Sequence, residues 1–455
     1  MLDGAPLMPP RIIPILDRLR QDIAAGLSRE TIEDACRQTK HRWRKRILDP
    51  ATTIYLFLLQ VLHGNTACQH VVHFGGWTFT DSAYCLARKR IPLAVYDWLV
   101  ERTASTMRSA SQGARWLGLR VWVVDSSSFS MPDEPELQRH FGQPGNQRKG
   151  CGFPVAKWLA LFDVGTGMLL RSRTAPLRTH DMSQVGRISD GPEPGDVVLG
   201  DRGFCSYAHL AMLLQRGLHA VFRIHQQQIV DFTPGRPTAR RKGPYPRPQG
   251  LPSSRWVLAH GATDQIVVWF KQKSNPKWMS ADEFAMLPSE IAVRELRYRV
   301  ETPGYRVREI TLVTTLLDAS TYQATDLAEL YYKRWRVELN FRHMKISMQM
   351  DVLRCETVEG ILKELAIFSL AYNLVRSVML ESARMRGTDP DRIGLIDAVR
   401  WLIGLEGTEC GAVLVINPSR RGRVEPRVVK RRPKQYMRMT KPRSELRKQL
   451  PMKYF

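Results

Sequence analysis

The sequence has few cysteines, and none stands where a disulfide framework or a zinc site would need it. Its seven cysteines are odd in number and scattered over 455 residues, with no C-x-x-C pair or Cys/His cluster. The longest predominantly apolar run, at residues 54–62, is far too short to span a membrane, and the amino-terminal residues lack the features of a secretory signal. These absences predict a cytoplasmic protein with reduced thiols and no membrane partner.

The chain also lacks a Walker-type G-x-x-x-x-G-K-[ST] sequence and any visible internal repeat, so we expect no ATP-driven activity. What it has in excess is positive charge: 68 Lys and Arg against 44 Asp and Glu give a formal net charge of +24 at pH 7. Such an excess favours a polyanionic partner, most simply nucleic acid, because each neutralised phosphate releases condensed counterions. Charge alone leaves a membrane surface, a ribosome or an ordinary basic enzyme open.

The order of the elements is that of an α/β protein. Helical periodicity dominates residues 1–112, and short apolar runs typical of buried strands follow from residue 119. Alternating strands around Pro- and Gly-rich loops fill residues 231–305, and helical periodicity returns from Thr325. Residues 420–448 hold thirteen Lys or Arg and two Glu, a net of 13 − 2 = +11. Such a tail is typical of a solvating arm or a non-specific nucleic-acid-binding arm.

Two of the predicted buried strands, at residues 121–124 and 196–199, each lead into an aspartate. Asp125 follows the first strand directly, and Asp201 follows the second after one glycine. Carboxylates at neighbouring strand ends converge at one sheet edge, where they repel each other unless a cation lies between them. The alternative is that each aspartate only caps a turn, as most strand-end aspartates do.

Residues 331–345 are predicted to form one helix with a stripe of chemically active side chains. At about 100° per residue, one narrow strip of its surface carries Tyr331, Arg334, Glu338 and Lys345. A carboxylate between two cations suits phosphoryl chemistry, because the carboxylate can ligate a metal while Arg and Lys hold phosphates. The alternative is a solvent-exposed face with ordinary ion pairs between neighbouring turns.

Asp125, Asp201 and Glu338 together form a candidate catalytic and metal-binding set. Hard oxygen ligands in a basic protein favour Mg²⁺, with Mn²⁺ as a substitute. Two such ions about 4 Å apart activate an attacking water or hydroxyl and stabilise the leaving oxygen of an in-line displacement. No protein nucleophile is needed, and the cations of the helix stripe would hold the strand and offset negative charge.

Basic side chains near residues 40–46 and 88–90 are candidate DNA contacts, because Arg binds phosphate and a tryptophan stacks on a sugar or base. The alternative is a charged helix surface around a core tryptophan. The candidate DNA-binding residues of this kind are Arg42, Trp43, Arg44, Arg88 and Arg90, and Arg342 adds a further cation from the 331–345 segment.

One pattern in the chain resembles the Y-(2)-R-(3)-E-(6)-K signature of the insertion-sequence-four family of bacterial DDE transposases. At identical spacing, the pattern is made by Tyr331, Arg334, Glu338 and Lys345. Asp125 with the serine after it, and the Asp-Arg-Gly-Phe turn at residues 201–204, look like the family's two aspartate motifs in the right order. The resemblance extends over most of the chain and is weakest around residues 231–290.

The resemblance implies an α/β fold with a ribonuclease H-like mixed-sheet catalytic domain and an inserted antiparallel β region, preceded by a helical N-terminal domain and followed by a helical, basic C-terminal region. It places Asp125 and Asp201 on strands and Glu338 on a following helix. The expected organisation is an N-terminal DNA-binding domain (1–112), a first catalytic part (113–230), a β-rich insertion (231–305), a second catalytic part (306–356) and a C-terminal region for DNA contact or dimerisation (357–455).

The resemblance also implies a reaction. The enzyme would bind the terminal inverted repeats of its own element, pair the ends in a homodimeric synaptic complex, cut the double-stranded DNA through a hairpin and join the freed 3′ ends to target DNA. Mg²⁺ would be the cofactor, with two ions in the site. Tyr331, Arg334 and Lys345 would contact phosphates near the cleaved end.

In some members of the family an inserted-domain tryptophan stabilises a flipped base, and the candidates here are Trp256, Trp269 and Trp278; each is also a candidate core residue. Two other functions remain open. A structure-selective nuclease on the same fold would cut DNA without joining it. A catalytically idle derivative would only bind DNA, and its hallmark would be a lost carboxylate, whereas all three carboxylates are present.

Overall fold

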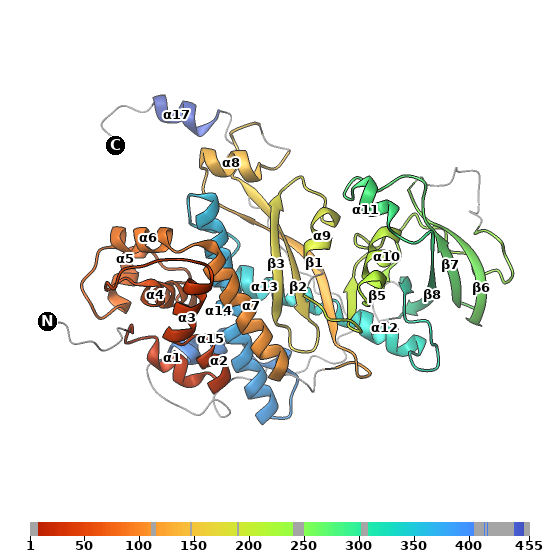
Figure 1. The fold of residues 1–455 in the computed structure, drawn as a ribbon, viewed down its shortest axis with the longest axis horizontal. Helices are drawn as coiled ribbons and strands as arrows, with labels where there is room; N and C mark the ends of the chain where they lie inside the picture. The colour runs from red at the N-terminus through yellow and green to blue at the C-terminus, as the bar shows by residue number, and fades with distance from the viewer. Residues whose placement is uncertain are drawn as a thin grey trace.

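A computed structural model shows a mixed α/β protein built around one large sheet. It describes residues 8–110, 115–145, 148–188, 191–239, 250–301, 308–404, 414, 416 and 441–449. Along the longest axis, a helical body lies at one end, the first strands lie in the middle, and an extension of the sheet lies at the other end (Figure 1). No helix in the described ranges has the length and apolar character needed to cross a bilayer.

The helical body combines elements from both ends of the chain. Its helices are α1 (Ile13–Arg18), α2 (Gln21–Ala25), α3 (Arg29–Gln38), α4 (Pro50–Leu62), α5 (Cys68–Val71), α6 (Asp81–Arg90), α7 (Leu93–Ala110), α14 (Val358–Met385) and α15 (Leu395–Ile403), with short 3₁₀ turns at Val72–Phe74 and Pro390–Arg392. Side-chain caps start several of them: at α3, for example, Ser28 accepts from the backbone N–H of Thr31.

Helix α14 is the centre of this body. The structure buries almost every residue from Ile361 to Met379. The reason is that α14 packs against α4 and α7 from the amino-terminal part, against α15, and against the sheet. The segments 1–112 and 357–455, which the sequence predicts as separate, therefore share one core.

The first five strands form a mixed sheet. They are β1 (Val121–Ser130), β2 (Val155–Asp163), β3 (Leu169–Pro176), β4 (Val197–Gly200) and β5 (His219–Arg223). Their order is β3-β2-β1-β4-β5, with β1 antiparallel to β2 and parallel to β4. Val121 and Val123 point into the core shared with the helical body, while Trp122 and Val124 join a second core under α9 (Met182–Ile188) and α10 (Tyr207–Gln215).

The prediction that a strand ends directly before Asp125 is wrong. β1 continues to Ser130, and Asp125 pairs with Ala160 of β2 in the middle of the strand. The polar run after Asp125 hides this continuation, because four residues with Asp and Ser resemble a turn. β4, in contrast, does stop at Gly200, so Asp201 lies at a strand end as predicted.

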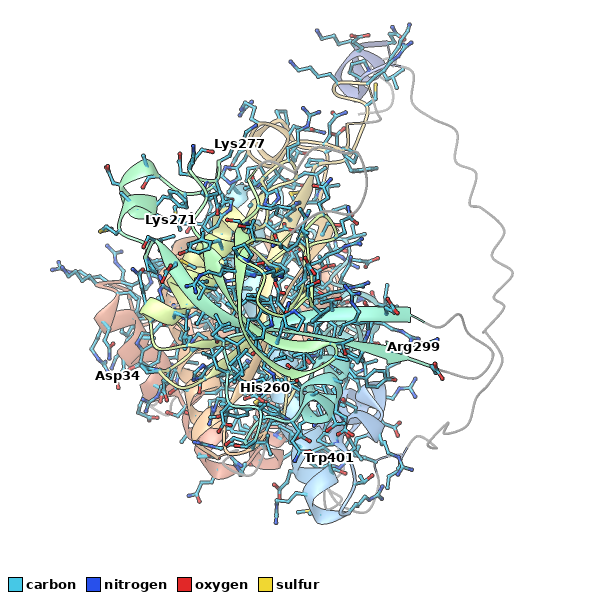
Figure 2. All side chains as sticks on the ribbon, turned by 90° about the vertical axis from the view of Figure 1, so that its right-hand side faces the viewer. Asp34, His260, Lys271, Lys277, Arg299 and Trp401 are labelled. Carbon is cyan, nitrogen blue, oxygen red and sulfur yellow. The ribbon has the colours of Figure 1, made fainter. Side chains whose placement is uncertain are left out.

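The insertion continues the same sheet. Strands β6 (Ser253–Gly261), β7 (Asp264–Phe270), β8 (Glu290–Val300) and β9 (Arg308–Thr314) are antiparallel, and β9 pairs with both β8 and β5 to complete one sheet of nine strands. Short helix α11 (Ala281–Ala285) lies near one end of these strands (Figure 1). Viewed from this side, Lys271 near α11 and Arg299 lie at opposite ends of the strands (Figure 2).

The segment that carries the signature is not one helix. It divides into α12 (Ala324–Lys333), α13 (Arg336–Arg342) and a π-helical turn, η2 (His343–Ser347). At the break, the backbone N–H groups of Arg334 and Val337 each donate to the third residue before them, which is 3₁₀ geometry. The remaining helices among the described residues are α8 (Pro135–Phe141) and α17 (Arg443–Gln449), and most of the basic 420–448 segment lies outside the described residues.

Candidate active site

A cleft of about 630 Å³ brings together the residues that the sequence singles out. It lies where β1 and the end of β4 meet α12, α13 and η2. Its lining consists of Asp125, Ser126, Ser127, Asp201, Arg202, Arg223, Tyr331, Arg334, Trp335, Glu338, Phe341, Arg342, Lys345 and Ile346. All three candidate carboxylates and all four signature residues therefore face one cavity.

The register of β1 and β4 places the two aspartates side by side. Val123 pairs with Leu199 in the parallel ladder, so two residues further along both strands the positions are Asp125 and Asp201. Backbone amides fix both carboxylates: Asp125 accepts from the N–H of Ser126 at 2.8 Å, and Asp201 accepts from that of Gly203 at 2.7 Å.

Helix α13 presents Glu338 to these aspartates while its other face packs on the sheet. Val337 and Phe341 are buried, and the Phe341 ring contacts the rings of Trp158 and Phe162 on β2 at centroid distances of 5.3 and 5.4 Å. Glu338 itself is exposed to the cleft. The break before α13 and the π turn after it change the helical register, yet all four signature residues still line this cleft.

The electrostatics of the cleft favour a cation next to Asp125. The pKa of Asp125 is raised to about 6, chiefly by burial and to a smaller extent by the nearby carboxylates of Asp201 and Glu338, against the lowering effects of the Ser126 N–H and Arg334. The three carboxyl groups are thus close enough for their charges to repel each other. A divalent cation between them would relieve this repulsion.

Arg334 occupies a different place from the one predicted for a DNA-phosphate contact. Only 7% of the residue is exposed, and its Nη1 contacts Asp125 Oδ2 at 3.4 Å. Its guanidinium also lies over the Trp335 ring, 4.6 Å from the centroid. Arg334 therefore lines the cleft while contacting both the Asp125 carboxylate and the Trp335 ring.

Tyr331 and Lys345 flank the cleft. Tyr331 is 3% exposed, and burial raises the pKa of its phenol. Lys345 is half-buried, donates to Ser127 Oγ at 3.2 Å, and has a pKa lowered by burial. Arg342 is exposed at the cleft wall. Lys345 and Arg342 are thus the signature-segment cations placed to meet a phosphate.

The donor set fits a hard divalent ion, although the three carboxylates do not form a closed cage. Within the described residues, no three Asp, Glu, His or Cys side chains lie close enough to bind one ion directly. Mg²⁺ does not require such a cage, because it keeps several waters and binds through one or two carboxylates and substrate phosphates. An open cleft with oxygen donors from β1, β4 and α13 meets that requirement.

A second cleft, of about 350 Å³, lies in the helical body and contains four of the five residues predicted there as DNA contacts. Arg42, Arg44 and Arg90 are exposed around it, and half-buried Trp43 forms part of its wall. The buried hydroxyl of Thr53 lines the same cleft without a hydrogen-bond partner. We call this the N-terminal cleft.

Arg88, the fifth, has a different role from the one predicted. Its guanidinium stacks over Phe57 at 3.7 Å and donates to Gln60 Oε1 at 3.2 Å and to Cys355 Sγ at 2.8 Å. Arg88 thus joins the amino-terminal helices to the segment before α14. The sequence does not reveal this, because Arg88 stands in a basic run whose neighbours are exposed.

None of the three tryptophans predicted as stacking candidates lines the active-site cleft. Trp269 is 1% exposed, and its indole N–H donates to buried Glu295 at 2.9 Å, so it is a core residue and not a stacking residue. Trp256 and Trp278 are half-buried in the insertion. The tryptophan that does line the cleft is Trp335, with 46% of its surface exposed.

The lining also includes residues that the sequence does not predict there, among them Trp335, Arg202, Arg223 and Ser127. Arg202 directly follows Asp201, and Arg223 is the last residue of β5, the neighbour of β4. The rule that the carboxyl ends of parallel strands share one edge would have found Arg223. Ser127 is hidden because the length of β1 is not readable from its polar residues.

Comparisons with known proteins agree with this geometry. The family model described as "Transposase DDE domain" matches residues 116–374, more than half of the 455-residue chain. The chain is 24% identical to the transposase InsG for insertion sequence element IS4 of Escherichia coli K12 over 374 residues, which cover 78% of this chain and 77% of InsG. It is 32% identical to the protein InsZ of the same organism over 143 residues, 30% of this chain and 46% of InsZ.

Among solved structures, the chain is similar to a piggyBac transposase in a synaptic complex with hairpin DNA, with a TM-score of 0.40 and 10% identity over 87% of this chain and 80% of that one. This likeness is too weak to add to the assignment. The family model spans the strands and helices that build the cleft, and the IS4 relative extends the match over most of the chain. The chain belongs to the DDE transposases of the insertion-sequence-four family.

Proposed function

We propose that this DNA transposase works by a cut-and-paste reaction: it binds the terminal inverted repeats of an insertion sequence, cleaves the DNA ends through a hairpin, and joins the 3′ ends to target DNA by two-metal-ion phosphoryl transfer. The observation that carries the proposal is the convergence of Asp125, Asp201 and Glu338 in one cleft that is also lined by Arg223, Arg342 and Lys345. Carboxylates for divalent ions and cations for phosphates are the two parts such a reaction requires.

In this proposal the three carboxylates hold Mg²⁺ or Mn²⁺, which when bound activate the attacking oxygen and stabilise the leaving one. The chain's own residues do the rest. Arg334 holds Asp125 in place, and Lys345 and Arg342 bind the phosphates on either side of the scissile bond. Lys345 donates to the neutral hydroxyl of Ser127. A phosphate oxygen of bound DNA would replace that hydroxyl as the acceptor, and the new hydrogen bond would join two charged groups.

The arrangement of the sheet supports a ribonuclease H-like catalytic domain. Asp125 lies on central strand β1, Asp201 follows the parallel strand β4, and Glu338 lies on a helix packed over β1 and β2. Strands β6, β7 and β8 are inserted between β5 and α12 in the sequence, as the resemblance implies. The positions of the three carboxylates in this topology are those expected of such a domain.

DNA binding outside the catalytic cleft is assigned to the N-terminal cleft. Its exposed Arg42, Arg44 and Arg90 suit a phosphate backbone, and Trp43 offers a stacking surface. The two ends of the element are held in a homodimer, in which each protomer supplies one catalytic cleft. In the insertion, Trp256 and Trp278 remain the candidates for stabilising a flipped base.

The test uses the DNA that flanks the gene, which supplies the terminal repeats. Wild-type protein with Mg²⁺ and a pre-cleaved repeat with a free 3′-OH is expected to join that end to a plasmid. A structure-selective nuclease would cut the uncleaved repeat but give no joined product, so the joining assay separates the two functions.

Substitution of each carboxylate completes the test. Asp125→Ala, Asp201→Ala and Glu338→Ala are expected to bind the repeat as wild type does, yet to lose metal-dependent cleavage and joining by at least about a thousandfold. Cleavage that persists in any of the three would remove that residue from the catalytic set. DNA binding without cleavage by the wild type would indicate an idle derivative.

A further inference from the structure

A network of charged side chains lies on the side of α13 away from the cleft; Arg376 and Asp391 in it are largely buried, whereas Arg336 is partly exposed and Asp389 is exposed. Arg336, two residues before Glu338, points about 200° around the helix from it. Its Nε lies 3.2 Å from Asp391 Oδ2, and its Nη2 lies 2.6 Å from Asp389 Oδ2. The other oxygen of Asp391 accepts from Arg376 Nη2 at 2.6 Å. Asp391 therefore bridges two arginines, one on α13 and one on α14.

Arg376 extends this network to the sheet. It is 1% exposed, and its Nε donates to the carbonyl oxygen of Thr166 in the turn between β2 and β3. Gly167 in that turn has φ +72°, and a Cβ there would lie 2.6 Å from the Arg376 guanidinium. Tyr372, one turn earlier on α14, donates to the Gly167 carbonyl at 2.6 Å. The chain Arg336–Asp391–Arg376 thus ties α13 to the hairpin of the catalytic sheet.

Helix α13 needs such a tie because little else fixes its rotation. It has seven residues, with a 3₁₀ break before it and a π turn after it, so its own hydrogen bonds contribute little stability. Val337 and Phe341 hold it on β2, but apolar contact is non-directional and tolerates a small rotation. Charge-assisted bonds from Arg336 to two carboxylates fix direction as well as distance.

The cost of desolvation indicates that the largely buried Arg376–Asp391 pair of this network has a purpose beyond stability. Burying charged groups carries a desolvation penalty that well-packed apolar residues would avoid, so a buried ion pair is weak support for a stabilising role. Burial opposes ionisation of Asp391, but Arg376 and Arg336 hold its pKa below the usual range. Arg376 and Asp391 also lie beyond residue 374, where the match to the family model ends.

We propose that Arg336 and Asp391 are positioning residues that set the rotation of α13, so that Glu338 faces Asp125 and Asp201 and completes the divalent-ion site. This inference rests on the proposed function of the three carboxylates. It predicts that the charge network controls metal affinity from outside the cleft, in the way that groups behind a metal ligand usually do.

Arg336→Gln is the most informative variant, because it removes the ion pairs that hold α13 and leaves the Arg376–Asp391 pair intact. Mn²⁺ binding to the DNA-free protein is measured by the loss of the free-ion electron paramagnetic resonance signal. Arg336→Gln is expected to raise the Mn²⁺ concentration for half-saturation about tenfold, and to raise the Mg²⁺ concentration for half-maximal DNA cleavage by a similar factor.

Arg384→Gln is the matched control. It also removes one positive charge, and Arg384 pairs with Glu381 at 2.6 Å on the exposed side of α14. It is expected to leave Mn²⁺ affinity, cleavage and DNA binding as in wild type. If Arg336→Gln behaves like Arg384→Gln in both metal titrations, the inference is overturned.

A double-mutant cycle with Glu338→Gln tests whether Arg336 acts through Glu338. If it does, adding Arg336→Gln to Glu338→Gln weakens Mn²⁺ binding no further, whereas independent effects would multiply and contradict the inference. The proposed function fails differently: it fails if Glu338→Gln and Asp201→Asn leave Mn²⁺ binding and cleavage unchanged. If Arg336→Gln and Arg384→Gln have equal melting temperatures, a weaker Mn²⁺ affinity of Arg336→Gln reflects the position of Glu338 and not a general loss of stability.

Discussion

The active-site cleft and the N-terminal cleft are both rich in basic residues, but these residues differ in burial and in the contacts they make. In the active-site cleft, Arg334 is buried against Asp125, and Lys345 is half-buried and bonded to Ser127. In the N-terminal cleft, Arg42 and Arg90 are exposed. Cations that contact carboxylates serve to position them, and cations that are open to solvent are available for a polyanion.

The comparison shows why a basic residue near a predicted site is not automatically a DNA contact. Arg334 and Arg88 both stand in basic sequence surroundings, and the structure gives both to intramolecular contacts. Arg90, two residues after Arg88, is exposed. The distinction depends on which side of a helix faces the core. On this basis we expect the N-terminal cleft to bind DNA without taking part in the chemistry.

Among changes to the basic residues of the two clefts, the largest expected effect comes from Arg334→Lys. Lysine keeps the charge but loses the planar guanidinium that reaches Asp125 and stacks on Trp335. We expect single-turnover cleavage at saturating DNA and Mg²⁺ to fall about a hundredfold, while the dissociation constant for DNA changes by less than about threefold. Quantitative gel shifts and rapid-quench cleavage measure the two quantities on the same DNA.

The opposite pattern would erase the difference between the clefts. If Arg334→Lys weakens DNA binding strongly and cleaves at the wild-type rate once DNA is saturating, Arg334 binds phosphate, as the sequence suggests. Arg384→Gln serves again as the control for the loss of an ordinary surface arginine pair.

A smaller effect, and one on binding alone, is expected in the N-terminal cleft. The double variant Arg42→Gln with Arg90→Gln should weaken DNA binding about tenfold near 0.1 M salt, and should reduce the slope of log affinity against log salt by about two. Cleavage at saturating DNA should not change, because neither residue lines the active-site cleft. A loss of cleavage rate without a loss of affinity would contradict the division of roles.

Much of the fold is readable from sequence because its elements have strong local signals. Such signals are apolar periodicity, apolar runs and helix caps, and they are present in helices α4, α6 and α10 and in strands β2, β7 and β8. What local signals cannot show is which elements share a core. The burial of α14 on all sides, and the extension of the catalytic sheet by β9, depend on contacts between distant segments.

The candidate site divides in the same way. Asp125, Asp201 and Glu338 are identifiable from residue type and order, and the structure brings them into one cleft. The length of β1 is not identifiable, because Ser126 and Ser127 lack the apolar character of a strand and are ordered by pairing with β2. The π turn that carries Lys345 and the anchoring of Arg336 by Asp391 also lack a sequence signal.

The smallest expected effect is on the free energy of unfolding. It distinguishes the two clefts in a measurement that needs no DNA. Asp125 has a pKa of about 6 in the folded chain, above the value of about 3.9 expected when unfolded, so the folded state binds more protons between these values and loses stability as pH rises through them. At pH 7.5 in EDTA, Asp125→Asn should therefore increase the free energy of unfolding by about 1–2 kcal/mol in urea titrations. The gain should shrink towards pH 5, where wild-type Asp125 is protonated, and saturating Mg²⁺ should stabilise the wild type more than the variant.

Arg90→Gln in the N-terminal cleft should change stability by less than about 0.5 kcal/mol, because it relieves no buried charge. An Asp125→Asn protein no more stable than wild type at pH 7.5 would mean that burial and the neighbouring carboxylates do not raise the pKa of Asp125 in the folded chain.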